Sequence, residues 1–589
     1  MLSNLRKNFT KIHEEIYSQE FQLFVILYFI SMVRTPRQSP GELKPNSPTP
    51  APPLEGEGTR GAKKLNLMRR FISVVFLFLL PALSSLAQYE NILIGTAFLP
   101  NEPSIMINPK NTNRMVAGAN IDNYYYSNDA GHTWLSGTLA SSYGVWGDPV
   151  IAADTAGNFY FFHLSYPPYP GNWIDRIVCQ KSTDGGATWN NGSYAGLNGA
   201  KAQDKAWVAI DPANNYIYIS WTQFDEYAPV PPNPNDSSNI LFSRSVDGGA
   251  HWSTPKRINR VAGDCEDSDN TVEGAVPAVG PNGEVYDAWA GPAGLVFNRS
   301  LDHGITWMNN NVYVSDIPGG WDYAIPGIYR ANGLPVTCCD LSNGPFRGTI
   351  YINWTDQRNG PTDTDVWLVK STDGGLTWNA RKRVNDDPAG KQQFFTWMTI
   401  DQTTGYLYFI FYDRRNYSDN KTDVYMAVSK DGGESFTNFR ISETPFDPFS
   451  SVFFGDYNNI SAHNNIVRPI WTRLDGSNLG IYTAIIDSLF AGVNETRELL
   501  SPMSLDQNYP NPSDEDTFIS FKIHSPSRIT LKVFDLYGRE ITTILNNQLL
   551  QPGKYLEHFD FSRFHIAPGI YFFSLINGDN ILKRKLVIR

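Results

Sequence analysis

Acidic side chains stand at the beginning of five apolar segments whose composition is typical of β-strands. They occur in the strings N-E-P-S, G-D-P-V, Q-D-K-A, V-E-G-A and G-D-Y-N, and are Glu102, Asp148, Asp204, Glu273 and Asp456. When like charges lie close together, at least one of their pKa values rises, which separates a general acid from a general base. We therefore predict that these side chains converge, with Asp148 and Glu273 as candidate catalytic groups and the other three as substrate-binding groups.

Arginines follow a second set of strand-like segments, and they are candidates for pairing with these carboxylates and for binding substrate. They are Arg358, Arg414, Arg415 and Arg473. A mixed acidic and basic rim is suited to binding or cleaving a sugar. The alternative interpretation is structural, with the carboxylates accepting hydrogen bonds from neighbouring amides and tying adjacent sheets together.

An acidic loop surrounds Cys265 and contains Asp264, Glu266, Asp267 and Asp269. Several carboxylates on a short loop suit calcium, which makes calcium the only candidate cofactor, although the spacing of an EF-hand is missing and a solvated surface loop is the favoured interpretation. Cys338 and Cys339 are adjacent on a predicted strand, so their side chains face opposite ways. Both a disulfide, for example with Cys265, and buried free thiols remain open.

The elements that must position these residues belong to an internal repeat. The octamer S-T-D-G-G-A-T-W, which begins at Ser182, recurs with small changes six times in all, starting at Ser127, Ser182, Ser245, Ser300, Ser371 and Ser429. The spacing is roughly 60 residues, a period typical of repeat architectures. Gly supplies positive φ angles and Asp and Ser accept turn amides, so each octamer predicts a hairpin turn.

These octamers resemble the Asp box, or BNR repeat, of sialidases and related propellers. The resemblance implies that each box joins the two outer strands of a blade on the face opposite the active site, which makes its residues structural. These residues are Asp129, Trp134, Asp184, Trp189, Asp247, Trp252, Asp302, Trp307, Asp373, Trp378, Asp431 and Phe436. We expect an all-β fold in which residues 89–488 form a seven-bladed Asp-box β-propeller, closed by an outer strand within 91–98. A six-bladed propeller is the alternative.

The resemblance to sialidases has one gap. That family begins its first blade with Arg-Ile-Pro, whose arginine binds the sialate carboxylate, whereas this chain has Asn101-Glu102-Pro103-Ser104. An acid in that place repels a carboxylated sugar and argues against a sialidase reaction. We expect a secreted or cell-surface monomer that acts on an extracellular glycan or glycoprotein, as a glycoside hydrolase or as a non-catalytic propeller that binds glycan or protein.

The C-terminal part predicts a separate small Ig-like β-sandwich over residues 505–589, joined through a linker at 489–504. Its strings Q-N-Y-P-N-P, V-F-D-L-Y-G-R, P-G-I-Y and the closing K-R-K-L-V-I-R resemble the type A sorting domain of type IX secretion. The resemblance implies contact with the type IX secretion machinery, export from a Gram-negative bacterium, and a signal that includes Lys583, Arg584 and Lys585. An Ig-like carbohydrate-binding module is the alternative.

The N-terminal part predicts export as well. Residues 68–87 combine Arg69 and Arg70, an apolar run and a small-residue end, which is typical of a signal peptide and too short for a membrane anchor. We interpret residues 1–67 as a mis-called, disordered extension. The chain of 589 residues has a net charge of −11 and lacks clusters of Lys and Arg, which argues against nucleic acid as a partner.

Overall fold

The computed structural model describes residues 89–168, 171–487, 503–523, 526–535, 539–564, 566–577 and 580–589. The predicted extension 1–67, the predicted signal peptide 68–87 and most of the predicted linker 489–504 lie outside the described residues. No helix in the described part of the chain combines the length and apolar character that crossing a membrane requires.

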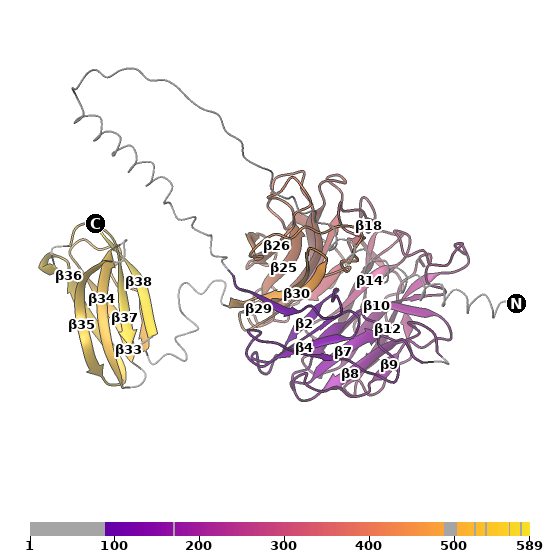
Figure 1. Ribbon diagram of the computed structural model, residues 1–589, viewed down its shortest axis with the longest axis horizontal. Helices are drawn as coiled ribbons and strands as arrows, with labels where there is room; N and C mark the ends of the chain where they lie inside the picture. Colours follow the sequence, from indigo (N-terminus) through magenta and orange to yellow (C-terminus); the bar gives the residue numbers. More distant parts are fainter. Residues whose placement is uncertain are drawn as a thin grey trace, which may run out of the picture. The chain divides into compact units, whose positions relative to one another are not determined.

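The propeller within residues 91–487 has seven antiparallel blades, and in the first six the strands follow sequence order from the axis outward (Figure 1). Blade 1 contains β2 (Ser104–Ile107), β3 (Met115–Ala119), β4 (Asn123–Ser127) and β5 (Leu135–Thr138). Blade 2 contains β6 (Val150–Ala153), β7 (Phe159–Leu164), β8 (Ile177–Ser182) and β9 (Ser193–Ala195). Blade 3 contains β10 (Ala202–Ile210), β11 (Ile217–Phe224), β12 (Ser238–Ser245) and β13 (Lys256–Arg257).

The remaining blades follow the same order. Blade 4 contains β14 (Glu273–Val279), β15 (Val285–Ala290), β16 (Leu295–Ser300) and β17 (Val312–Ser315). Blade 5 contains β20 (Val336–Cys339), β21 (Ile350–Asp356), β22 (Asp365–Ser371) and β23 (Lys382–Arg383). Blade 6 contains β24 (Gln393–Asp401), β25 (Tyr406–Asp413), β26 (Asp423–Ser429) and β27 (Thr437–Arg440). A small sheet of β18 (Asp322–Tyr323) and β19 (Ala331–Asn332) lies between blades 4 and 5 in sequence.

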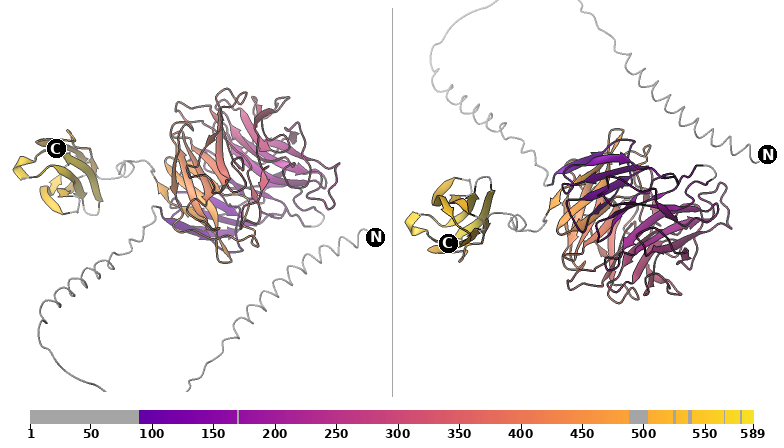
Figure 2. Two further views of the ribbon diagram at one scale, coloured as in Figure 1. Left: turned by 90° about the horizontal axis from the view of Figure 1, so that it is seen from above. Right: turned by 90° about the horizontal axis from the view of Figure 1, so that it is seen from below.

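The ring is closed by pairing the two ends of the propeller. Blade 7 contains β28 (Asn459–His463), β29 (Ile466–Asp475) and β30 (Asn478–Ala484), and its outer strand is β1 (Asn91–Gly95), antiparallel to β30. A short strand β31 (Ile486–Asp487) also pairs with β29. Both views in Figure 2 show the indigo start of the propeller beside its orange end. The blade number and the closing strand are therefore as predicted.

A buried arginine adds a second fastening at this closure. Arg468 of β29 is fully buried; its Nε donates to the carbonyl of Ala130 in blade 1 at 2.8 Å, and its Nη1 lies 2.8 Å from Asp487 Oδ1. The side chain thus joins the last blade to the octamer turn of the first blade and stabilises the ring at the point where these two blades meet.

Each octamer forms the turn between the third and fourth strands of a blade, and its serine is the last residue of the third strand. In blade 5, Ser371 Oγ donates to Asp373 Oδ1 at 2.7 Å and accepts from the Gly375 amide at 2.8 Å. Thr377 donates to the same carboxylate through its amide at 3.0 Å and its hydroxyl at 2.6 Å. The aspartate therefore closes the turn by accepting hydrogen bonds.

The aromatic residue that ends each octamer, Trp189 and Trp378 included, is half-buried. Trp378 packs edge-to-face on Phe297 of blade 4 with ring centroids 5.2 Å apart, and Trp307 packs on Phe242 of blade 3 at 4.8 Å. These rings bridge from one blade to the preceding one at the rim of the propeller, where one edge stays in contact with solvent.

The C-terminal unit consists of two antiparallel sheets around one apolar core. One sheet contains β32 (Met503–Leu505), β33 (Asp516–Ile523) and β36 (Gly553–Asp560); the other contains β35 (Glu540–Leu550), β34 (Ser527–Asp535), β37 (Gly569–Asn577) and β38 (Asn580–Ile588). A short 3-10 turn, η1 (Ser562–Phe564), follows β36. The sandwich has the predicted all-β character.

Candidate functional site

The five acidic residues of the sequence analysis lie at the beginning of inner strands, and all five are buried. A residue with positive φ at this point bends the chain in blades 1, 2, 3, 4, 6 and 7, namely Glu102, Asp148, Lys205, Gly274, Phe395 and Gly455. In blades 3, 4 and 6 the pairing of the inner strand shifts by a β-bulge at the same place. Bulges redirect side chains, so these strand ends can turn polar groups toward the axis.

Lys205 holds three of these carboxylates together. Its Nζ lies 2.7 Å from Asp456 Oδ2, 3.8 Å from Asp148 Oδ2 and 3.9 Å from Glu102 Oε1. Asn120 adds a neutral link, since it donates to Glu102 and accepts from the Asp148 amide at 2.8 Å. The chain segments of blades 1, 2, 3 and 7 are thus joined around one buried ammonium group.

Arg330 approaches the same cluster from the segment between blades 4 and 5. Its Nε donates to Asp456 Oδ1 at 2.7 Å, its Nη2 also binds Asp456, and its Nη1 donates to Asp267 Oδ2 at 3.3 Å. Tyr227 donates its hydroxyl to the same oxygen of Asp267 at 2.7 Å. We call Glu102, Asp148, Asp204, Lys205, Asp267, Glu273, Arg330 and Asp456 the axial cluster.

The axial cluster separates the pKa values of its carboxyl groups. Burial raises the pKa of Glu273 well above its usual value, and the carboxylates of Asp267 and Asp204 add to the shift. Burial and Asp148 raise the pKa of Asp204 to about 8. For Asp456, burial is outweighed by Lys205 and Arg330, which hold the pKa of that carboxyl well below its usual value. A protonated acid and an ionised carboxylate therefore coexist in the cluster near neutral pH.

A small cavity of about 30 Å³ adjoins both Glu273 and Asp456. Its lining also includes Lys205, Asp267, Asp322 and Arg330. Oε1 of Glu273 has no hydrogen-bond partner among the described residues. A space of this size holds one or two water molecules and not a sugar ring. A substrate would therefore have to lie outside it, against the partly exposed side chains of Arg330 and Asp267.

A much larger cavity of about 640 Å³ fills the middle of the ring and is lined by the inner strands, mostly with apolar side chains. Trp207 and Trp397, whose ring centroids are 4.1 Å apart, line this cavity and also a small space beside Lys205 and Asp456. Cys338 also lines this cavity.

All four cysteines lie in the described part of the chain and are free thiols, so the possible disulfide between Cys265 and Cys338 or Cys339 is not formed.

The cations that pair with the cluster are Lys205 and Arg330, not the arginines expected from the sequence. Arg358 binds Asp356, and Arg473 pairs with Asp475 at 2.7 Å. Arg414 donates to the carbonyl of Pro326 at 2.7 Å. Arg358 and Arg473 thus pair with an acid in their own loops, whereas Arg414 contacts the segment between blades 4 and 5; all three guanidinium groups are paired away from the axial cluster.

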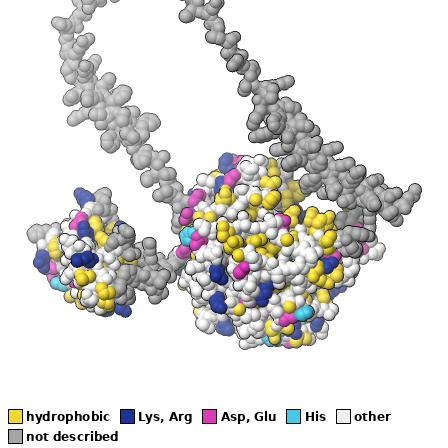
Figure 3. All heavy atoms as spheres, turned by 60° about the horizontal axis from the view of Figure 1, so that its bottom comes forward, with side chains coloured by type: hydrophobic (Ala, Val, Ile, Leu, Met, Phe, Trp, Pro, Cys, Tyr) yellow, Lys and Arg dark blue, Asp and Glu magenta, His cyan; other side chains and the backbone are white. Residues whose placement is uncertain are grey.

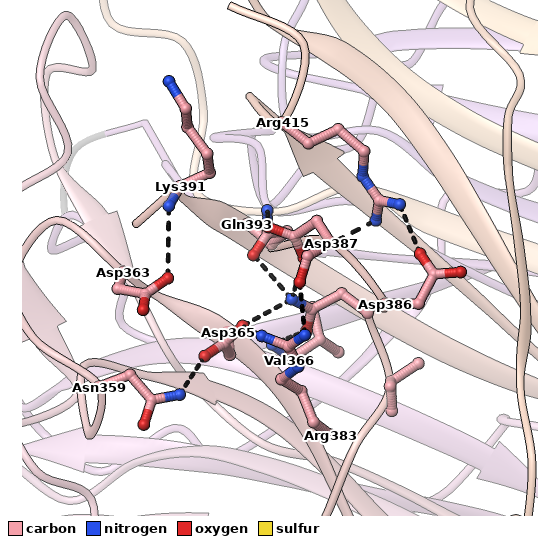
Figure 4. A network of polar contacts seen from close by, with 12 residues as sticks. Asn359, Asp363, Asp365, Val366, Arg383, Asp386, Asp387, Lys391, Gln393 and Arg415 are labelled. Carbon is pink, nitrogen blue, oxygen red and sulfur yellow. Dashed lines mark hydrogen bonds and ion pairs between the residues drawn. The ribbon is translucent and has the colours of Figure 1, made fainter. Parts of the chain in front are cut away.

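Arg415 belongs to a separate polar network between blades 5 and 6 (Figure 4). It binds Asp413 and Asp386, and Gln393 donates to Asp387 at 3.0 Å. Asp365 accepts from Asn359 at 2.5 Å and lies 3.2 Å from Arg383. Arg415 is paired with two acids inside this network, so the network ties two blades together rather than presenting Arg415 to a ligand.

The carboxylates of the acidic loop make two kinds of contact: hydrogen bonds that hold local structure and an ion pair with Arg330. Asp264 accepts from the Thr271 hydroxyl at 2.8 Å, Asp269 accepts from the Asp322 amide at 2.8 Å, and Asp267 joins the axial cluster. Glu266 is exposed. Among the described residues no group of His, Cys, Asp and Glu is arranged to hold a metal ion. Three of these carboxylates are therefore occupied as acceptors from Thr271, Arg330 and the Asp322 amide, whereas Glu266 faces the solvent.

Two decisive members of the cluster were missed by sequence reasoning. Lys205 follows Asp204 directly, in the place where Glu102 and Asp148 are followed by proline, so this departure from the pattern was a usable signal. Arg330 lies in the segment that carries β18 and β19, outside the repeat, and no spacing pointed to it.

Residues 507–589 match the family model of the secretion system C-terminal sorting domain. These residues are a type IX secretion sorting domain. The protein is therefore secreted or displayed at the surface of a Gram-negative bacterium, as the sequence predicted. In its last strand, Lys583 and Lys585 are exposed and Arg584 is half-buried, while Gln507 and Asn511 donate to the carbonyl of Lys585 at 2.7 and 2.9 Å.

No curated protein matches the sequence. The fold is similar to several solved propellers. The Hadza microbial sialidase Hz136 is 14% identical, with a TM-score of 0.37 over 64% of this chain and 75% of that chain. The NanB sialidase of Streptococcus pneumoniae is 10% identical, with a TM-score of 0.38 over 63% and 83%. The Penicillium chrysogenum α-L-arabinanase is 11% identical, with a TM-score of 0.38 over 68% and 99%. These are similarities of fold.

Proposed function

We propose that the exported propeller acts on extracellular glycans as a glycoside hydrolase, with the axial cluster as its active site. Glu273 supplies the proton to the leaving oxygen through a water molecule in the adjoining cavity, and the ionised carboxylate of Asp456 assists the water molecule that attacks the sugar. The observation that carries the proposal is that one water-sized cavity is lined by a carboxyl of raised pKa with an unpartnered oxygen and by a carboxylate of lowered pKa. Glycoside hydrolysis uses this division between two carboxyl groups.

Lys205 and Arg330 keep the two roles apart. Both cations contact Asp456, whereas Glu273 forms no ion pair within 4.0 Å in the described structure. Asp456 is therefore held in its ionised form, while burial raises the pKa of Glu273 and favours its protonated form. Asp148, our other catalytic candidate, contacts Lys205 and stays a candidate for the base.

The second candidate function is a propeller that binds glycan or protein without catalysis. It is favoured by the near-complete burial of Glu102, Asp148, Asp204, Glu273 and Asp456, which is also what a structural ion-pair network requires. In that case the charged groups join blades, and the ligand contacts only the surface around Arg330.

The deciding experiment is the variant Glu273→Gln, which keeps the shape of the side chain and removes the proton that it donates. The mature protein is screened against polysaccharides and aryl glycosides, and kcat of the variant is measured on whatever is cleaved. We expect kcat to fall by about 100-fold or more, the range typical of losing a general acid. The matched control is Glu284→Gln, in the turn at the opposite end of the same blade.

Full hydrolysis by Glu273→Gln would contradict the proposal. Binding of a polysaccharide by the wild-type protein with no cleavage of any substrate in the screen would support the non-catalytic alternative instead.

A further inference from the structure

A row of aromatic side chains lies beside the axial cluster. Ring centroids of Tyr166 and Trp146 are 4.9 Å apart, those of Trp146 and Trp173 are 6.1 Å apart, and those of Trp173 and Tyr227 are 5.4 Å apart. The first three are strongly exposed for aromatic residues: 51% for Tyr166, 37% for Trp146 and 40% for Trp173. We call these four residues the aromatic row.

The row is held in place by the backbone. The Tyr166 amide donates to the Tyr143 carbonyl at 3.1 Å, and a Cβ on Gly144 would lie 1.9 Å from the Tyr166 carbonyl oxygen, so this close approach requires glycine. Beside Trp173, the Ile174 amide donates to the Ser165 carbonyl at 2.9 Å, and the Ile174 carbonyl accepts from the Gln203 amide at 2.7 Å. The backbone at Tyr166 and beside Trp173 is therefore held by hydrogen bonds to neighbouring segments.

Two members of the row, Trp146 and Tyr227, connect it to the axial cluster. Trp146 precedes Asp148 by two residues, and the Trp146 amide donates to the Leu164 carbonyl at 2.9 Å at the end of β7. Tyr227 donates to Asp267, which binds Arg330, which binds Asp456. A ligand lying on the row therefore ends against Arg330 and the cavity next to Glu273.

Charge at this end selects against anionic ligands. Asp267, Asp269 and Asp322 lie together there, and burial together with the first two raises the pKa of Asp322. Arg330 is the cation that faces them among the described residues, and it is already paired with Asp456 and Asp267. On the face seen in Figure 3, Lys and Arg side chains are scattered singly and form no continuous basic patch. A carboxylated or sulfated sugar would meet net negative charge at the mouth.

We propose that the aromatic row is the binding platform for an uncharged polysaccharide, whose sugar rings pack in the corner formed by Trp146 and Trp173, two rings at 88° to each other, and reach the axial cluster at Tyr227. The apolar face of a pyranose or furanose ring covers an indole ring, and the hydroxyl groups at its edge remain free for Arg330, Asp267 and Asp322. This inference rests on the proposed function, since it names the substrate class of the same site.

The test measures binding apart from turnover. Migration of the protein is followed in native gels containing hydroxyethyl cellulose, mannan or linear arabinan, with hyaluronan as the carboxylated probe. The variants are Trp146→Ala and Trp173→Ala, each made in the full chain with and without Glu273→Gln. The matched control is Tyr313→Ala on β17, an aromatic residue on the outer strand of blade 4 that is more exposed (61%) than either tryptophan.

We expect at least one neutral polysaccharide to retard the wild-type protein, and each tryptophan variant to be bound at least tenfold more weakly at an unchanged unfolding midpoint. Tyr313→Ala should bind like the wild-type protein. Unchanged retardation of both tryptophan variants would overturn the platform, and so would the absence of binding to any neutral probe. Binding of hyaluronan as tightly as the neutral probes would overturn the substrate class.

Failure of the platform and failure of the proposed function give different results. If the platform is wrong and the function is right, Glu273→Gln lowers kcat by about 100-fold or more while both tryptophan variants retain normal kcat/KM on polysaccharide. If the function is wrong and the platform is right, the tryptophan variants lose binding although no glycosidic bond is cleaved by any form.

Discussion

Replacing Lys205 with methionine tests whether the axial cluster depends on one buried cation. At 2.7 Å, and with an effective dielectric constant of about 20, the attraction between Lys205 and Asp456 is about 6 kcal/mol. Desolvation of the buried ammonium group offsets part of this attraction, and breaking a buried pair typically costs about 3–5 kcal/mol. We expect the free energy of unfolding of Lys205→Met to fall by about 3–5 kcal/mol at pH 8.

The destabilisation should depend on pH in a definite direction. In the wild-type protein Lys205 and Arg330 hold the pKa of Asp456 well below its usual value, so its ionised form stabilises the fold above the usual range and this contribution is lost as the pH falls. Without Lys205 the pKa of Asp456 rises, and the folded variant takes up protons as the pH falls toward 5. The difference between variant and wild type should therefore be smaller at pH 5 than at pH 8.

The assay is equilibrium unfolding in urea at both pH values, with Lys201→Met as the matched control. Lys201 pairs with Asp225 at 2.5 Å, but its side chain is 40% exposed, so its loss should cost less than about 1 kcal/mol. Equal stability of Lys205→Met and the wild-type protein at pH 8 would refute the reasoning, as would a destabilisation that is the same at both pH values.

Three further predictions concern other parts of the chain. Burial raises the pKa of Asp287 to about 8, which disfavours the folded state increasingly as the pH rises from about 4 to 8, so the stability gained by Asp287→Asn should grow between pH 5 and pH 8 in thermal unfolding. A pH-independent effect would count against this assignment. Trp378→Ala removes a half-buried inter-blade contact and should lower the free energy of unfolding by about 2–3 kcal/mol, without changing any binding or cleavage, because it lies at the far end of the blade. Loss of activity in a stably folded variant would contradict a structural role. Deleting residues 505–589 should leave a folded propeller in the periplasm, as judged by immunoblots of cell fractions, and normal amounts outside the cell would contradict the role of the sorting domain.

The sequence by itself determined the features that depend on local patterns. Six octamers with glycines and hydrogen-bonding side chains at the same spacing predicted the turns between outer strands, and the repeat around them predicted the seven blades. The closing strand β1 could be predicted because the last repeat lacked one strand and a strand-like segment stood unassigned at the other end. The C-terminal motifs identified the sorting domain, because its strands and its signal lie within one continuous stretch.

Only the tertiary structure decided which charges meet. The positions of Glu102, Asp148, Asp204, Glu273 and Asp456 followed from the repeat, because equivalent positions of successive blades surround one axis. Their partners did not. Lys205 reaches Asp456 across 251 residues of sequence and Arg330 reaches it across 126.

The physical reason is that a buried carboxylate is stabilised by whichever cation the folded chain brings within a few ångströms, and sequence distance carries no information about that. Arg358, Arg414 and Arg415 looked equally suitable, but Arg358 and Arg415 each pair with an acid two residues away and Arg414 donates to the Thr422 hydroxyl in its own loop. The aromatic row was invisible for the same reason, since Trp146, Trp173 and Tyr227 come from three separate connections that meet only when blades 2 and 3 are side by side.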